Sequence, residues 1–148
     1  KCQNNVWVIS AGCRSLAIAP DYRFCVTAEP NTHHLISTII GKEGEMKYSE
    51  PFYYLHDLSN GAQQMAGNMA FDTKGNLYVA MGMGVQVADH NGRVRAILSL
   101  PAGGVKSLAF SGNYLYVVCG DRMFVRKMKA EGHLPKNGKV AYKSQGQG

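Results

Sequence analysis

This sequence contains no long apolar run, and its four cysteines form no paired motif. A bilayer-spanning helix needs roughly 18 to 20 apolar residues in a row, and none of the 148 residues belongs to such a run. No C-x-x-C pair occurs, and no cluster of cysteine and histidine has the spacing of a zinc site. Helical periodicity is also missing. The sequence therefore argues against a membrane-spanning helix, a zinc module and a helical fold.

Charged residues are scarce, at 18% of the chain, but they are unbalanced and give a formal net charge of +6. A nucleic-acid-binding surface would also carry a recognisable motif or interleaved aromatic residues, and neither is present. We interpret the basic residues as a solvated outer strand and tail, and we expect no nucleic-acid partner. Much of the excess falls late in the chain, in Arg122, Arg126, Lys127, Lys129, Lys136, Lys139 and Lys143.

The four cysteines have two expected environments. Cys25 and Cys119 lie within apolar strand patterns, where a buried free thiol is the usual state. Cys2 and Cys13 would pair in a disulfide if the protein is exported, for example to a periplasm, and the sequence leaves both the pairing and the compartment open. The chain begins at Lys1 without a signal peptide, so a processed form, a trimmed form and a fragment all fit.

Internal repetition is the most informative feature of the sequence. Residues 15–28, 68–80 and 107–118 share an order: a polar residue, a large apolar residue, Ala, another apolar residue, a turn, and a strand rich in β-branched and aromatic residues. The repeat length, roughly 40 to 50 residues, is typical of four-stranded propeller blades. The equivalent small residues suit an innermost strand, because blades crowd together near the axis. These residues are Ala17, Ala70 and Ala109.

Alternation and turn signals place the other strands. We expect them at residues 34–40, 52–56, 84–89, 94–100 and 122–128, with an Asn91-Gly92 hairpin turn in the second repeat. We therefore predict an all-β chain that forms a single unit over residues 1–148. It should contain three four-stranded antiparallel blades and make half of a six-bladed β-propeller. The expected blade bounds are about 15–57, 67–100 and 105–130.

The third repeat has only three clear strands. Residues 6–10 form an unpaired strand before the first repeat, and residues 139–142 are a weaker candidate after the third. Three blades cannot close a ring, so their open faces would expose apolar surface and strand edges. We therefore expect a partner. It is either a second copy in a two-fold homodimer, with strand 6–10 completing the partner's third blade, or a missing N-terminal half.

Several segments carry motifs whose order is more specific than any one of them, since many propellers carry such motifs singly. The motifs are Gly67-Asn-Met-Ala-Phe-Asp-Thr-Lys-Gly-Asn-Leu-Tyr-Val-Ala80, Gly84-Val-Gln-Val-Ala-Asp89, Asn91-Gly-Arg-Val94, Tyr116-Val-Val-Cys-Gly-Asp121 and, more weakly, residues 16–21. Through them most of the chain resembles the gluconolactonase, senescence-marker-protein and luciferin-regenerating-enzyme family, and it looks like the C-terminal half of such a protein. The resemblance implies a six-bladed propeller with a divalent cation such as calcium in its channel, and hydrolysis of lactones or related esters.

The metal ligands that the resemblance implies are not matched. The family's Asn before one innermost strand falls on Arg14, and its Asp before another falls on Gly67. Its Glu belongs to the half that this chain does not contain. Asn68 lies one residue away, but a single neutral oxygen donor holds no metal. We therefore expect no cofactor and no tightly bound calcium or zinc on the channel axis.

The residues at these positions suggest a different ligand. Aligning the repeats makes Arg14, Gly67 and Lys106 equivalent, just before the innermost strands. Two cations repel a divalent metal and suit an anion, since an arginine can fork onto a carboxylate or phosphate. We expect a small anionic molecule or sugar acid to bind in the channel. The candidate ligand-binding residues are Arg14, Ser15, Asn68, Lys106 and Ser107.

Two functions remain open, and the catalytic residues are unknown, since no nucleophile lies in a recognisable arrangement with a base. The first is a binding half-propeller with a degenerate metal site. The alternative is a metal-dependent lactone or ester hydrolase whose site a partner or missing half completes. A simpler interpretation of the candidate anion site is that Arg14 and Lys106 pair with Glu29 or Asp121 and bind no ligand.

We interpret His33 and His34 as surface groups.

Overall fold

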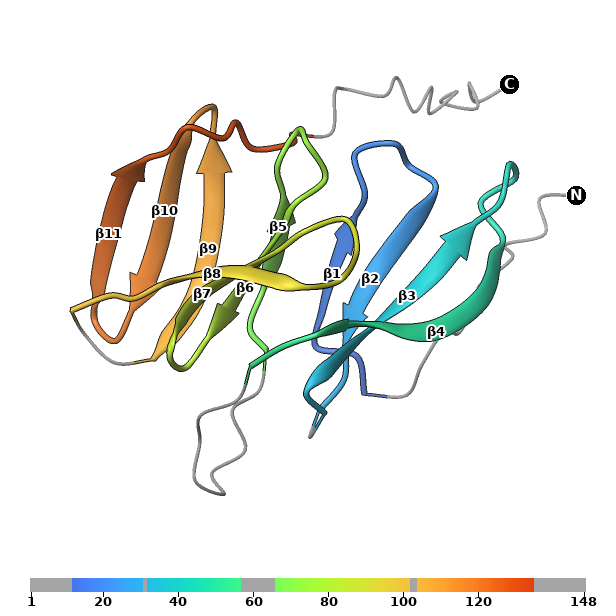
Figure 1. The fold of residues 1–148 in the computed structure, drawn as a ribbon, viewed down its shortest axis with the longest axis horizontal. Coiled ribbons are helices and arrows are strands. Elements are labelled where there is room, and N and C mark those ends of the chain that lie inside the picture. The colour runs from blue at the N-terminus through green and yellow to red at the C-terminus, as the bar shows by residue number, and fades with distance from the viewer. Residues whose placement is uncertain (1–11, 31, 57–65, 102–103, 135–148) are drawn as a thin grey trace, which may run out of the picture.

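The computed structural model describes residues 12–30, 32–56, 66–101 and 104–134. Within these ranges the chain forms eleven strands and no helix. The strands make three antiparallel sheets that stand side by side like the vanes of a fan (Figure 1). Those same ranges contain no helix that is long and apolar enough to cross a membrane. We call the sheets blades one, two and three, in chain order.

Each blade is a meander in which every strand pairs with its neighbours in the sequence. Blade one contains β1 (Ser15–Ile18), β2 (Phe24–Ala28), β3 (His34–Ile40) and β4 (Met46–Tyr54). Blade two contains β5 (Met69–Phe71), β6 (Leu77–Met81), β7 (Gly84–Ala88) and β8 (Val94–Leu98). Blade three contains β9 (Val105–Ser111), β10 (Tyr114–Cys119) and β11 (Arg122–Lys127).

The first strands of the three blades are the innermost ones. β5 contacts both β1 and β9, and the three arrowheads point the same way in Figure 1. The prediction of antiparallel, all-β repeats is therefore confirmed, with four, four and three strands in the blades. The candidate fourth strands of blade three, residues 6–10 and 139–142, lie outside the described residues. Closure into six blades stays a prediction.

The outer strand of blade one is longer than predicted. We expected it at residues 52–56, whereas β4 begins at Met46. Residues 47–51 of this strand are exposed and include Lys47, Glu50 and Pro51, so this part shows no apolar alternation. A proline fits here because an edge strand has N–H groups that need no partner in the sheet. The strand forms because β3 pairs with it along its length, across two register shifts.

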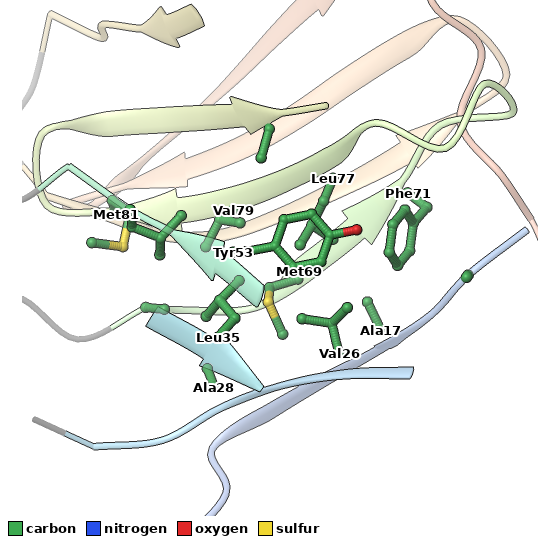
Figure 2. Close-up of a cluster of buried hydrophobic side chains, with 14 residues drawn as sticks. Ala17, Val26, Ala28, Leu35, Tyr53, Met69, Phe71, Leu77, Val79 and Met81 are labelled. Atoms are coloured by element: carbon green, nitrogen blue, oxygen red, sulfur yellow. The ribbon is translucent and has the colours of Figure 1, made fainter. Parts of the chain in front are cut away.

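The blades pack through large side chains of one blade against alanines of the blade before it. Met69 and Phe71 of β5 share a buried cluster with Ala17 of β1, and Figure 2 shows them gathered with Val26, Leu35 and Tyr53. In the next interface, Leu108 and Phe110 of β9 share a cluster with Ala70 of β5. The repeated pattern of large, Ala, large in the sequence thus sets the spacing between blades.

After β11 the chain crosses the far ends of the innermost strands. The amide of Gly132 donates to the carbonyl of Gly112, at 2.9 Å, and the amide of His133 donates to that of Phe71, at 2.8 Å. The ring of His133 then stands edge-on to Tyr22 of blade one, with 5.7 Å between centroids. Residues 128–134 therefore tie all three blades together at the end opposite to the starts of β1, β5 and β9.

Candidate functional site

The predicted ligand-binding residues lie at one end of the innermost strands. Arg14 comes just before β1, Asn68 just before β5, and Lys106 is the second residue of β9. Since β1, β5 and β9 run in the same direction, their first residues share one end of the fan (Figure 1). The fold thus brings these residues to a common end, as the repeat alignment predicted.

Arg14 is exposed, and its backbone extends the β1–β2 pairing by one residue. Its amide donates to the carbonyl of Ala28, at 3.0 Å, which fixes the backbone of this residue beside β2. No carboxylate among the described residues forms an ion pair with its guanidinium. The group is therefore available for an anion at this end of the molecule.

Lys106 occupies an irregular position in β9. Ser107 lies opposite Val118 and Val105 lies opposite Cys119, so Lys106 is the extra residue of a β-bulge. Bulges redirect a side chain away from the regular alternation of a strand. Lys106 is exposed, and within the described ranges it makes no ion pair. Asp121 instead lies beside Arg122, with 3.8 Å between Oδ1 and Nε.

Gly67 stands where two backbones meet. Its amide donates to the carbonyl of Ala80, at 2.7 Å, which continues the β5–β6 ladder. A Cβ atom added at Gly67 would lie 2.8 Å from the carbonyl oxygen of Lys106 and 3.0 Å from Cβ of Ala80. Real Cβ atoms do not approach a backbone oxygen so closely. An aspartate at this position would therefore require blade three to move.

Asn68 holds blades two and three together. Its Nδ2 donates to the carbonyl of Leu108 and its Oδ1 accepts from the amide of Leu108, both at 2.6 Å. The side chain thus acts as a short piece of β-ladder between β5 and β9. One donor and one acceptor lone pair of the amide remain for a ligand, but its orientation is fixed by the backbone.

Ser15 and Ser107 occupy the equivalent positions in the other two blades. Ser15 Oγ is buried and has no hydrogen-bond partner among the described residues. A buried hydroxyl without a partner is costly, so Ser15 does not gain stability from this oxygen. Ser107 is half-buried and belongs to the face of blade three that neither of the other two described blades covers.

The sequence did not reveal the importance of Gln86. This side chain is fully buried, its Oε1 accepts from the amide of His56, and its Nε2 donates to the His56 carbonyl. Gln86 therefore fastens the end of blade one to blade two, as Asn68 fastens blade three. The available signal was a polar residue between Val85 and Val87 in an apolar strand, because such residues must find partners when buried.

The acidic residues at turns serve the backbone. Asp72 is fully buried and accepts from the amides of Lys74 and Asn76 through Oδ1, at 2.9 and 2.8 Å. Asp89 accepts from the amide of Arg93 in the same way, at 3.1 Å. At both positions the aspartate supports a local turn. No group of three or more His, Cys, Asp or Glu side chains in the described ranges could hold a metal ion.

Two of the described cysteines are buried, as predicted. Cys25 and Cys119 are both fully buried, and burial raises the pKa of the Cys25 thiol. Cys13 is exposed and carries a free thiol, while Cys2 lies outside the described residues. Low thiol acidity together with burial makes Cys25 a poor nucleophile.

A groove lies between blades one and two, at the end opposite to the starts of β1, β5 and β9. It has a volume of about 310 Å³ and is lined by Pro20, Asp21, Phe24, Phe71 and Lys74 among others. Tyr53 also lines this groove, and burial raises the pKa of its phenol to about 12. This groove contains none of the predicted ligand-binding residues. The two ends of the innermost strands therefore differ in their side chains, and the predicted ligand-binding residues lie only at the end where the strands begin.

No family model matches the sequence. No curated protein matches it either. Solved structures do resemble the chain. A putative gluconolactonase superposes with a TM-score of 0.70 at 17% sequence identity, over 82% of this chain and 40% of that one. A gluconolactonase from Xanthomonas campestris gives 0.66 at 18% identity, over 82% of this chain and 38% of the other.

A third structure is a calcium-binding protein, regucalcin from Agrobacterium tumefaciens. Its TM-score is 0.65 at 17% identity, over 82% of this chain and 46% of its own. This chain thus spans less than half the length of the structures it matches. Identities this low establish the fold alone. The chain shares the fold of gluconolactonases and regucalcin over its three blades, which confirms the resemblance that its motifs indicated.

Proposed function

We propose that this chain is a half-propeller that binds a small organic anion, such as a sugar acid, at the end where β1, β5 and β9 begin. One observation carries the proposal. Arg14 and Lys106 are both exposed at this end, and neither has a carboxylate partner among the described residues. A guanidinium and an ammonium that are not neutralised favour an anion between or beside them.

The same end is unsuited to a divalent cation. At the position of the family's aspartate, the carbonyl of Lys106 leaves no room for a side chain on Gly67. Asn68 is the nearest oxygen donor, and its amide is oriented by Leu108. A hard cation requires several oxygen ligands, usually including carboxylates. The residues present do not fit calcium, and we derive no catalytic step through a metal.

Recognition of a sugar acid would use different groups for its two ends. The Arg14 guanidinium can fork onto the carboxylate, and Lys106 adds a point charge. The Asn68 amide keeps one N–H and one lone pair that Leu108 does not use, and these can bond a sugar hydroxyl. Hydrogen bonds to charged groups contribute about 1.5 to 3 kcal/mol each. Loss of Arg14 should therefore weaken binding by roughly ten- to a hundredfold.

Titration calorimetry with gluconate, glucuronate and a sugar phosphate tests this function. We expect binding that weakens with added salt and that is reduced in both Arg14→Ala and Lys106→Ala. Lys42→Ala is the control, because Lys42 is an exposed cation in the β3–β4 turn. The proposal is wrong if none of these anions binds, or if the control weakens binding as much as the two variants do.

The alternative function is a metal-dependent lactone or ester hydrolase whose site is completed outside this chain. Its support is the fold, which is that of gluconolactonases and of a calcium-binding protein. Lactone hydrolysis measured with calcium and with a chelator separates the two functions. Calcium-dependent turnover that disappears in Asn68→Ala would favour the hydrolase. Anion binding without turnover would favour the binding module.

A further inference from the structure

The two interfaces inside the chain follow one rule. Large residues on the first strand of a blade face the preceding blade, and an alanine between them faces the following blade. Met69 and Phe71 share a cluster with Ala17, and Leu108 shares one with Ala70. Among the described blades, the rule leaves two faces without a neighbour, the outer face of blade one and the outer face of blade three. It predicts that an alanine of a neighbouring strand would cover the first face and that large apolar residues would cover the second.

The unmatched face of blade one presents the large residues of the rule. Leu16 and Ile18 of β1 are 53% and 41% exposed, although their equivalents in blades two and three are buried. The open part of this face is confined to β1, because Cys25 and Thr27 on the same side of β2 are buried. A docking partner for blade one should therefore meet its innermost strand.

The unmatched face of blade three presents the alanine. Ala109 of β9 lies opposite Tyr116 of β10, which lies opposite Val125 of β11. Val118 and Met123 lie opposite each other in the next row. Val125 and Met123 are 51% and 66% exposed, so an apolar face extends across all three strands. Exposed apolar patches of this kind mark interaction surfaces.

We propose that a second copy of this chain covers both faces. Blade three of one copy docks against blade one of the other, with Leu16 and Ile18 on Ala109, and a two-fold axis generates the same contact a second time. The contact continues the rule of the two interfaces within the chain. Both copies then have every innermost strand between two others, and no end face remains open.

The two end blades differ in their balance of charge. Acidic residues outnumber basic ones in blade one, and the reverse holds in blade three. The charged residues of blade one are Asp21, Glu29, Glu43, Glu45 and Glu50 with Arg14, Arg23, Lys42 and Lys47. Those of residues 104–134 are Lys106, Arg122, Arg126, Lys127 and Lys129 with Asp121 and Glu131. Complementary charge favours contact between unlike ends over contact between like ends.

The solved structures agree with a partner of this size. This chain matches 38% to 46% of the solved chains that share its fold, so a second unit of three blades would account for most of the rest. One edge of β11 has no partner strand in the described part of the chain, because β11 pairs only with β10 there. Strand 6–10 of the second copy stays our prediction for that edge.

The mass of the particle in solution is the first test. Light scattering on the full chain should give twice the chain mass of 16.1 kDa. A stable single chain overturns the proposal, and so does an open assembly of many copies. Either result can occur whether or not Arg14 and Lys106 bind an anion, so failure here is distinct from failure of the proposed function.

Two charge variants test the orientation. Leu16→Lys and Ala109→Glu should each reduce the mass to that of one chain, because each places an unpaired charge in both contacts. Mixed in equal amounts, they should restore the doubled mass. The mixed pair has one unaltered contact and one in which the introduced lysine would meet the introduced glutamate. Both substituted positions are exposed, so circular dichroism should show that each single variant keeps its β-structure.

Lys42→Ala serves again as the control and should keep the doubled mass. The orientation is overturned if either charge variant alone keeps the doubled mass, since that outcome requires an interface without β1 or without β9. It is equally overturned if the folded variants fail to associate when mixed. A contact between two copies of blade three, for example, would be insensitive to Leu16→Lys.

Discussion

Blade two and blade three are built from similar sequences but lie in different surroundings. β6 of blade two is buried at all five positions, whereas β10 of blade three alternates between buried and exposed residues. In most half-exposed strands the solvent side is polar. In β10 the outward residues are Tyr114, Tyr116 and Val118. The end blade therefore has the composition of a blade that is covered on both faces.

The polar contacts between blades show the same contrast. Blade two reaches both neighbours with a side-chain amide, since Gln86 bonds the backbone of His56 and Asn68 bonds that of Leu108. In blade one the position of Asn68 is taken by Ser15, whose hydroxyl finds no partner in the described residues. The central blade thus supplies the specific contacts that align the fan, and the end blades supply complementary apolar faces.

The largest effect should come from removing a large residue between two blades. Phe71 is 2% exposed, and Phe71→Ala should lower the free energy of unfolding by about 3 to 5 kcal/mol. Ile18 is its equivalent on the open face, and Ile18→Ala should cost about 1 kcal/mol or less when the chain is single. Urea unfolding at low protein concentration measures both.

At high concentration the Ile18→Ala cost should rise, because the proposed dimer buries that residue. Equal costs for Phe71→Ala and Ile18→Ala in the single chain would mean that the central and end blades do not differ in burial. A cost for Ile18→Ala that stays constant with concentration would remove Ile18 from the dimer contact.

The second comparison concerns Gly67 and Arg14, which the repeats make equivalent. Gly67→Asp should lower the free energy of unfolding by roughly 1 to 3 kcal/mol, because its Cβ would press on the Lys106 carbonyl. Arg14→Asp, at the exposed edge of blade one, should change it by no more than about 0.5 kcal/mol. Calcium should not raise the melting temperature of Gly67→Asp. A calcium-dependent increase would show that a metal site can form after all.

The sequence predicted the three repeats, their innermost strands and the position of the candidate site, because repeat spacing and Ala17, Ala70 and Ala109 report local structure. It did not predict the Gly67 contact with Lys106, since that contact joins two repeats through backbone atoms. The length of β4 was missed for a different reason. Its exposed half carries no apolar pattern, and only pairing with β3 defines it.

A third comparison separates Asn68 from Ser15. Asn68→Ala leaves the amide and carbonyl of Leu108 without their side-chain partners, and should lower the free energy of unfolding by about 1 to 2 kcal/mol. Ser15→Ala removes a buried hydroxyl that has no partner in the described residues, and should be neutral or slightly stabilising. If Ser15→Ala destabilises the chain as much as Asn68→Ala does, the hydroxyl has a partner that compensates its burial.

The smallest effects should come from two carboxylates in turns. Partial desolvation raises the pKa of Asp89, but the amides of Arg93 and Asn91, with Arg95, outweigh it and hold the pKa below its ordinary value. Glu45 has a pKa of about 2, because it bonds Lys47 and backbone amides in the β3–β4 turn. One carboxylate lies in the central blade and relies on amides, and the other lies in an end blade and relies on an ion pair.

Both pKa values are lowered by folding, so each carboxylate stabilises the fold above its ordinary pKa and loses that contribution as the pH falls through the folded value. For Glu45 the window runs from 4.5 down to about 2. Melting temperatures across this window should fall less steeply in Asp89→Asn and in Glu45→Gln than in the parent.

Added salt should remove most of the Glu45 contribution, because the Glu45–Lys47 pair is solvent-exposed and screened. It should leave most of the Asp89 contribution, since amide donors keep their place beside the carboxylate at any ionic strength. Equal salt sensitivity in the two variants would mean that Asp89 depends mainly on Arg95, its charged neighbour at 3.6 Å, and that the central turn differs from the outer one only in position.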